Sequence, residues 1–98
     1  MNWVIVFHPD VADEVRDAYR WYESRQTGLG DDFLAALETV YDALRATPEQ
    51  HQIIEQDIRH SRLRRFPYAV YYRILADRVE VIAVHHGSRD PDAWRSRI

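Results

Sequence analysis

The chain of 98 residues is long enough for one small domain, and we expect a single domain over residues 1–98. Hydrophobic residues make up 46% of it, with 3 Gly and 4 Pro, which excludes the disordered and low-complexity classes. The absence of Cys excludes disulfides and cysteine nucleophiles, and no apolar run approaches the ~20 residues that span a bilayer. We therefore expect a cytoplasmic protein with no contact to a membrane.

The net charge of -3 conceals an uneven distribution of charge along the chain. Residues 1–57 carry 4 Arg and 12 acidic residues, whereas residues 58–98 carry 9 Arg and 4 acidic residues. Every basic side chain is Arg, whose planar guanidinium pairs bidentately with carboxylates and phosphates. The second part of the chain therefore predicts a cationic surface.

The first half of the sequence predicts a strand and two helices. Residues 3–7 are a continuous run of β-forming residues, and Pro9-Asp10 then marks the start of a helix. Gly28-Leu29-Gly30 breaks this helix, and Asp31 or Asp32 is expected to cap the next one. The apolar residues of each helix share one face: Val11, Val15, Ala18 and Tyr22 in the first, and Phe33, Leu37, Val40 and Leu44 in the second.

The second half changes to β-like patterning. Pro48 ends the second helix near Thr47, and three strands are expected at 58–66, 68–76 and 79–86. Their short connections predict an antiparallel meander, and Asp90-Pro91-Asp92 starts a short last helix. The predicted fold is α+β in the order β-α-α-β-β-β-α, with a helical hairpin packed on one face of a small antiparallel sheet.

Four arginines crowd the first strand of the meander. Strand alternation places Arg59 and Arg65 on one face and Arg62 and Arg64 on the other. Such a strand beside several tyrosines suits recognition of phosphate or carboxylate groups, whereas charge on an edge strand also prevents aggregation. Both interpretations remain open at this point.

Two adjacent histidines end the last strand. His85 and His86 point to opposite faces, so only one of them faces the arginines. We expect His85 to be hydrogen-bonded beneath the sheet, while His86 is a candidate general base. Because neighbouring strand residues diverge and no HxxxH spacing occurs, we expect no metal site and no cofactor.

Taken together, these motifs resemble the RelE/ParE superfamily of bacterial toxins, the toxin halves of type II toxin–antitoxin modules. The resemblance extends from about Val4 to Arg97 and rests on the order and spacing of several short motifs. They are Phe7-His8-Pro9, Trp21-Tyr22-Glu23, Gly28-Leu29-Gly30, Phe33, Arg65-Phe66-Pro67-Tyr68, Val70-Tyr71-Tyr72, the run from Ala83 to Pro91, and Trp94-Arg95.

The superfamily divides by mechanism. RelE-like members cut messenger RNA on the ribosome by acid–base chemistry, and the resemblance would give that role to Arg65, His86 and Arg89. Trp94 stands about where RelE-like toxins often carry a tyrosine, and an indole transfers no proton at neutral pH. The Arg-Asp-Pro…Trp ending is more similar to the ParE branch, the plasmid-stabilisation toxins, whose members are described as DNA gyrase poisons without a catalytic residue.

Either branch implies a cognate antitoxin with an acidic and apolar segment that folds on binding. The resemblance implies a surface for target or antitoxin, made by residues of the second half of the chain: Arg59, Arg65, Tyr72, Arg73, His86, Arg89, Trp94 and Arg95. DNA gyrase is the expected target, with ribosome and messenger RNA as the alternative, and no direct DNA binding is expected for the toxin alone. A third possibility is a degenerate module member that is no longer toxic.

Overall fold

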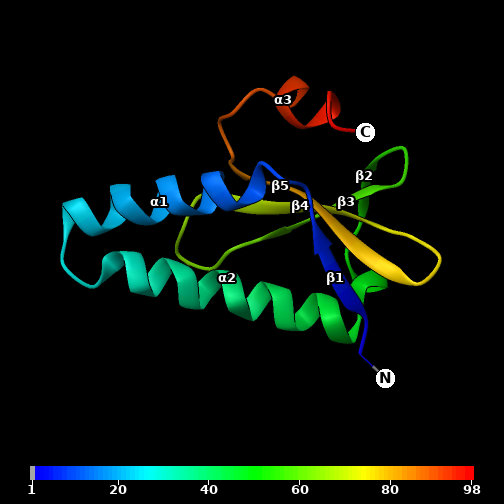
Figure 1. Ribbon diagram of the computed structural model, residues 1–98, viewed down its shortest axis with the longest axis horizontal. Coiled ribbons are helices and arrows are strands. Elements are labelled where there is room, and N and C mark those ends of the chain that lie inside the picture. Colours follow the sequence, from blue (N-terminus) through cyan, green and yellow to red (C-terminus); the bar gives the residue numbers. More distant parts are fainter. Residues whose placement is uncertain (1) are drawn as a thin grey trace.

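The computed structural model describes residues 2–98 and contains five strands, three α-helices and one 3₁₀ helix. In chain order the elements are β1 (Val4–Phe7), α1 (Val11–Arg25), α2 (Leu29–Ala46), η1 (Pro48–Gln50), β2 (Ile53–Glu55), β3 (Ile58–Arg62), β4 (Tyr68–Ile74), β5 (Arg78–His86) and α3 (Asp92–Arg95). Figure 1 shows α1 and α2 as an antiparallel hairpin, with α3 set apart from both. No helix formed by residues 2–98 is long and apolar enough to cross a membrane.

The predicted α+β architecture is confirmed, and three details of the sheet differ from the prediction. The strand order is β1-β5-β4-β3-β2, and β1 runs parallel to β5, so the sheet is mixed rather than wholly antiparallel. The short edge strand β2 was not predicted, because three residues are too few to show alternation. The first predicted strand of the meander also ends early, at Arg62 instead of Phe66.

The hairpin turn depends on glycine at two positions. Gly28 adopts φ 90°, a left-handed conformation that side chains other than glycine rarely tolerate. At Gly30 an added Cβ would lie 2.8 Å from the Tyr19 carbonyl oxygen, so only glycine allows the two helices this close approach. The Glu23 carboxylate accepts the N–H groups of Gly28 and Gly30, each at 2.9 Å. Glu23, rather than the predicted Asp31 or Asp32, therefore satisfies the first donors of α2.

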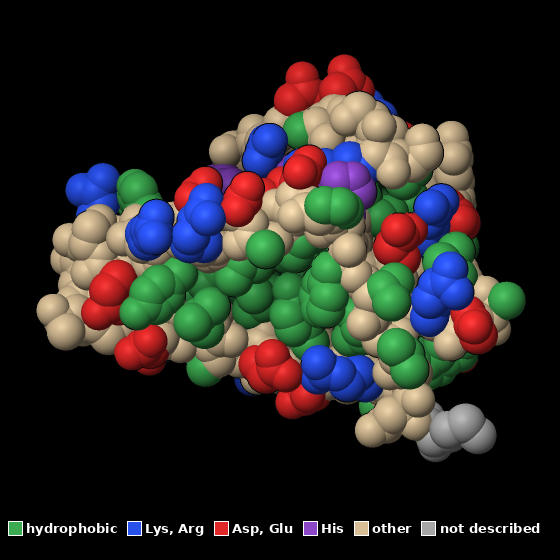
Figure 2. Space-filling view, in the orientation of Figure 1, with side chains coloured by type: hydrophobic (Ala, Val, Ile, Leu, Met, Phe, Trp, Pro, Cys, Tyr) green, Lys and Arg blue, Asp and Glu red, His purple; other side chains and the backbone are tan. Residues whose placement is uncertain are grey.

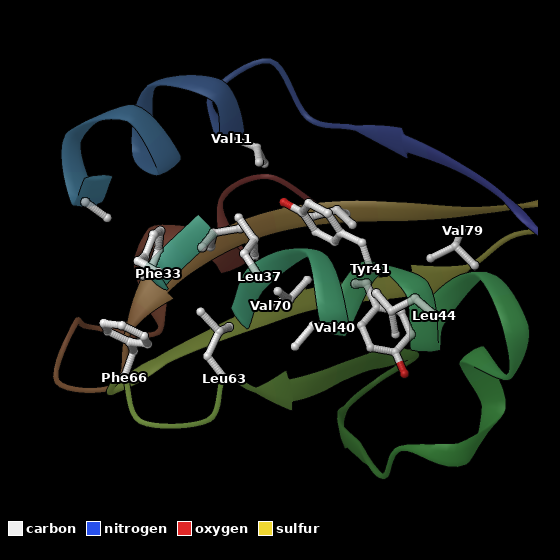
Figure 3. Close-up of a cluster of buried hydrophobic side chains, with 14 of the residues drawn as sticks. Val11, Phe33, Leu37, Val40, Tyr41, Leu44, Leu63, Phe66, Val70 and Val79 are labelled. Carbon is white, nitrogen blue, oxygen red and sulfur yellow. The ribbon is translucent and has the colours of Figure 1, made fainter. Parts of the chain in front are cut away.

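The core is divided by the sheet into two clusters. The larger cluster lies between the helical hairpin and the sheet, and Figure 3 shows Phe33, Leu37 and Leu44 of α2 facing the strands. The smaller one lies on the opposite face, where α3 packs, and consists of Ile58, Ile82, Ala83 and Trp94. An irregularity in the β4–β5 register, between Tyr71 and Tyr72, accompanies the placement of consecutive Ile82 and Ala83 in this second cluster.

Candidate functional site

The predicted cationic surface is largely neutralised within the molecule. Eight of the thirteen arginines lie within 4 Å of a carboxylate: Arg16, Arg45, Arg65, Arg73, Arg78, Arg89, Arg95 and Arg97. At the end of β3, however, Arg62 and Arg64 have no carboxylate partner among residues 2–98 and both are exposed. Both belong to the four-arginine segment that was considered for phosphate or carboxylate recognition, although neither is in the predicted set of target- or antitoxin-binding residues.

Two predicted binding residues, Arg59 and Tyr72, lie opposite each other in the β3–β4 register and serve the fold. The Arg59 guanidinium donates to the carbonyl oxygens of Glu49 and His51 at 2.9 and 2.6 Å. The Tyr72 hydroxyl donates to the Pro48 carbonyl at 2.7 Å, and burial raises the pKa of Tyr72 to about 12. Together they tie η1 and the chain after it to the sheet.

Arg73 and Arg95 also make internal contacts. Arg73 Nε donates to the Glu80 carboxylate at 2.8 Å, between paired positions of β4 and β5. Arg95 donates to Glu55 of β2 at 2.8 Å and to Asp92 at 2.9 Å. Arg95 thereby links α3 to the far edge of the sheet.

Trp94 is a core residue rather than a surface contact. Its side chain is 3% exposed and stacks on Tyr71, with ring centroids 5.4 Å apart. Tyr71 in turn stacks on His60 at 5.9 Å, so three rings form a column across the α3-side face of the sheet. Burial lowers the pKa of His60, with a contribution from the Arg62 charge, and keeps the imidazole neutral at neutral pH.

The side chains of the three candidate nuclease residues have different partners. Arg65 was predicted to share a strand face with Arg59, which is wrong because β3 ends at Arg62 and Arg65 adopts φ 71° in the following turn. It lies 3.7 Å from Asp32 at the start of α2, whereas Arg89 lies 3.7 Å from Glu14 in α1.

His86 makes contacts of its own. Its Nδ1 accepts the Ser88 N–H at 3.0 Å, and its ring meets Tyr68 edge-on. The Arg89 backbone N–H donates to the His86 carbonyl at 3.0 Å, but among residues 2–98 no side-chain hydrogen bond or ion pair joins any two of Arg65, His86 and Arg89. These contacts do not assemble an acid, a base and a phosphate-binding cation around one point.

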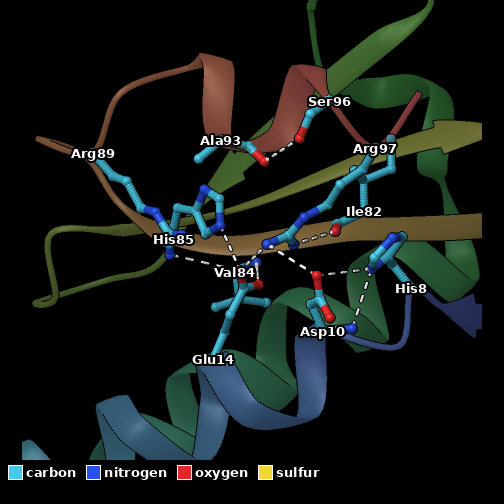
Figure 4. A network of polar contacts seen from close by, with 10 residues as sticks. All are labelled: His8, Asp10, Glu14, Ile82, Val84, His85, Arg89, Ala93, Ser96 and Arg97. Atoms are coloured by element: carbon cyan, nitrogen blue, oxygen red, sulfur yellow. Dashed lines mark hydrogen bonds and ion pairs between the residues drawn. The ribbon is translucent and has the colours of Figure 1, made fainter.

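A buried carboxylate that sequence reasoning missed organises the junction of α1, β5 and the C-terminal residues (Figure 4). The Glu14 side chain is 10% exposed and accepts hydrogen bonds from His85 Nε2 and Arg97 Nη2, both at 2.6 Å. Its other oxygen accepts the Val84 N–H at 3.0 Å, and Arg97 also donates to the Ile82 carbonyl at 2.9 Å. β1 ends at Phe7 and leaves the following part of β5 without a strand neighbour on that side. Glu14 and Arg97 therefore supply the hydrogen-bond partners for the backbone N–H of Val84 and the backbone carbonyl of Ile82.

The electrostatics of this Glu14 network follow from its contacts. Burial by itself raises the pKa of the Glu14 carboxyl, but hydrogen bonds from His85, Arg97 and the Val84 backbone outweigh it and lower the pKa to about 2. Glu14 is therefore ionised at neutral pH and compensates the Arg97 charge, which is itself 9% exposed. The prediction that His85 is hydrogen-bonded beneath the sheet is confirmed. Its partner was not foreseeable, because Glu14 lies 71 residues away.

Apolar side chains remain exposed between the two long helices. A groove of about 570 Å³ runs between α1 and α2, and Figure 2 shows its green floor with charged side chains along both rims. Phe7 and Leu34 in this groove are 46% and 37% exposed, and they adjoin the more buried Val15, Leu37 and Tyr41. An exposed apolar groove rimmed by charge is typical of a surface that receives a partner.

Residues 2–98 hold no group of three or more His, Asp or Glu side chains that could bind a metal ion. The Glu14 network, although rich in titratable groups, has its oxygen atoms occupied by hydrogen-bond donors.

Comparison with known proteins gives consistent matches over nearly the whole chain. The family described as the ParE toxin of type II toxin–antitoxin system, parDE, matches residues 5–91. Toxin ParE2 from two strains of Mycobacterium tuberculosis is 26% identical over 92 residues, which cover 93% of this chain and 88% of that protein. A solved structure, described as a chromosomal ParDE TA system from P. aeruginosa, aligns with a TM-score of 0.75 at 11% identity, over 86% of this chain and 95% of that one. At 11% identity this likeness establishes the shared fold.

Proposed function

We propose, because this chain belongs to the ParE toxin family of type II toxin–antitoxin systems, that it inhibits DNA gyrase by binding and catalyses no reaction. The family match over residues 5–91 carries the proposal. The toxin would act in the bacterial cytoplasm, where its target and its antitoxin are found. Its own surface would contact protein, and DNA would be reached only through gyrase.

The separate side-chain partners of the candidate nuclease residues support binding over catalysis. Cleavage of RNA needs a proton acceptor, a proton donor and a cation converging on one phosphate. Arg65 and Arg89 pair with acids on different helices, and the Nδ1 atom of His86 is occupied by Ser88. A surface that acts by docking needs no such convergence.

The antitoxin would cover the groove between α1 and α2. An amphipathic helix laid into a groove between two antiparallel helices buries apolar anchors spaced by three or four residues. Phe7 and Leu34 offer a place to such apolar anchors of an antitoxin segment that folds on binding. Covering this groove would bury Phe7 and Leu34, two of the exposed large apolar side chains.

The test of the toxin activity is a supercoiling assay with gyrase purified from the bacterium that encodes the chain. We expect loss of supercoiling and trapped cleavage complexes as toxin is added. Pulse labelling after induction distinguishes the alternative, because a ribosome-dependent nuclease stops protein synthesis within minutes while a gyrase poison leaves it running. Active gyrase at excess toxin, together with collapsed synthesis, would reject the proposal.

The antitoxin site is tested separately by co-expression with the cognate antitoxin. Leu34→Asp places a charge in the groove and should abolish neutralisation while the toxin stays folded. Ala35→Asp, an exposed neighbour on α2 outside the groove, is the matched control and should still be neutralised. Equal neutralisation of both variants would place the antitoxin elsewhere.

A further inference from the structure

The end of β3 is a second surface that the proposed function leaves unused. The β3–β4 register continues to Arg62, but the β2–β3 register covers only Ile58 and Arg59. Beyond Arg59, β3 therefore has no registered strand neighbour on its outer side within residues 2–98. Arg62 and Arg64 stand at this uncovered end without a carboxylate partner in residues 2–98.

Two hollows flank this edge, one on each face of the sheet, and Arg62 lines both. The hollow on the α3 side measures about 430 Å³ and is bounded by His60, Tyr71, Phe66 and Pro67. The hollow on the α2 side measures about 320 Å³ and includes Arg64. Neither shares a residue with the groove between α1 and α2, so this surface is separate from the proposed antitoxin site.

The lining of each hollow includes small side chains beside polar groups. On the α3 side the residue paired with Arg62 across the strands is Ala69, whose short side chain leaves room on the face. His60 borders that space, and its Nδ1 is one of two buried side-chain polar atoms in the described chain without a hydrogen-bond partner. On the α2 side, Ala36, Thr39 and Ala43 form the helical wall.

We infer that the outer edge of β3 binds an extended acidic polypeptide segment, with carboxylates on Arg62 and Arg64 and alternate side chains entering the two hollows. An added strand places successive side chains on opposite faces of the sheet, and here each face offers a hollow. Guanidinium groups without a carboxylate partner supply charge-assisted hydrogen bonds to carboxylates.

The charge of the molecule favours a polypeptide over a nucleic acid. A nucleic acid carries a charge at every nucleotide and needs a row of free cations. Here Arg65 and Arg89, the other arginines at this end of the sheet, are engaged by Asp32 and Glu14, and the net charge is -3. The guanidinium groups of Arg62 and Arg64 can instead pair with a few carboxylates of a short acidic peptide.

The probe is a short acetylated peptide in which glutamate alternates with isoleucine, titrated into the ¹⁵N-labelled full chain and followed by NMR. We expect shifts at the Ser61, Arg62 and Leu63 amides and at the Arg62 and Arg64 side-chain Nε signals. The double variant Arg62→Gln, Arg64→Gln should bind at least about tenfold more weakly, since each lost charged hydrogen bond is worth roughly a factor of ten. Arg20→Gln, which removes another exposed arginine without an acidic partner, is the control and should bind as the unmodified chain does.

Three further probes make the result decisive. A peptide with glutamine in place of glutamate lacks the carboxylates and should not bind. A peptide with alternate backbone nitrogens methylated lacks the N–H donors that pair with a strand and should not bind either. Equal response to the glutamine peptide, tighter binding of a short RNA, or shifts confined to the α1–α2 groove would each overturn the inference. Absence of any shift at millimolar peptide would do so as well, whatever the outcome of the gyrase assay.

Discussion

Removing the charge of Glu14 is expected to destabilise the fold more than removing any single surface charge. In Glu14→Gln the amide keeps the shape of the side chain but leaves Arg97, 9% exposed, without its buried counter-charge. The fall in pKa from 4.5 to about 2 corresponds to about 3 kcal/mol in favour of the ionised form. Breaking buried ion pairs by removing one partner costs about 3–5 kcal/mol, which agrees with this magnitude.

The assay is urea unfolding followed by circular dichroism at neutral pH. We expect Glu14→Gln to lower the free energy of unfolding by about 3 kcal/mol. Asp13→Asn is the matched control, because Asp13 is the preceding residue of the same helical turn and its side chain, 68% exposed, makes only a surface pair with Arg16. It should change stability by less than about 1 kcal/mol.

The same network predicts how stability depends on pH. The folded pKa of Glu14 lies below its unfolded value, so its contribution is complete above pH 4.5 and is lost as the pH falls toward 2. The unmodified chain should therefore lose about 3 kcal/mol more than Glu14→Gln across that window. A loss below about 1 kcal/mol in Glu14→Gln, or parallel pH profiles for the two proteins, would refute the role assigned to Glu14.

Two matched pairs of substitutions test the core and the hairpin turn. Leu37→Asp should unfold the protein, because it places an unpaired charge at a site that is 3% exposed, whereas Arg62→Ala should leave the melting temperature unchanged. Folding of the first or collapse of the second, measured by thermal unfolding, would show that these faces are misassigned. Gly30→Ala should cost about 1–3 kcal/mol, because its Cβ meets the Tyr19 carbonyl, while Gly87→Ala meets its nearest atom at 3.6 Å and should be nearly neutral. Equal stability of these two alanine variants in urea would contradict the close helix approach.

Local periodicity was sufficient to predict most of the fold. The apolar positions of α1 and α2 recur every three or four residues, which predicted both helices. Gly28 lies in the turn between them, and Pro48 follows the end of α2 at Ala46. The short turns between the strands of the meander indicated antiparallel pairing. The motif pattern also placed the chain on the ParE side of its superfamily, which the family match confirms. The position of β1 was beyond such reasoning, because nothing local in residues 4–7 indicates a parallel partner in β5.

The candidate site was harder to predict because ion pairing is non-local. Sequence alone showed many arginines but not which carboxylates would meet them. Arg95 finds Glu55 across 40 residues, and Arg97 finds Glu14 across 83. Only the fold reveals that Arg62 and Arg64 remain without an acidic partner among the described residues. Arg65 was misplaced because strand alternation was extended past the point where β3 ends.

The parallel pairing of β1 with β5 has a consequence for biosynthesis. β1 is the first of the five strands to be translated, yet its one neighbour in the described sheet, the stretch Arg78–Val81 of β5, belongs to the last. The Glu14 network likewise waits for Arg97. A nascent chain can form its helical hairpin early, but the sheet that covers the hairpin's apolar side is complete only after β5 has been translated. Ribosomes that stop short would therefore release a hairpin with its hydrophobic face uncovered, a substrate for proteolysis rather than a partial toxin.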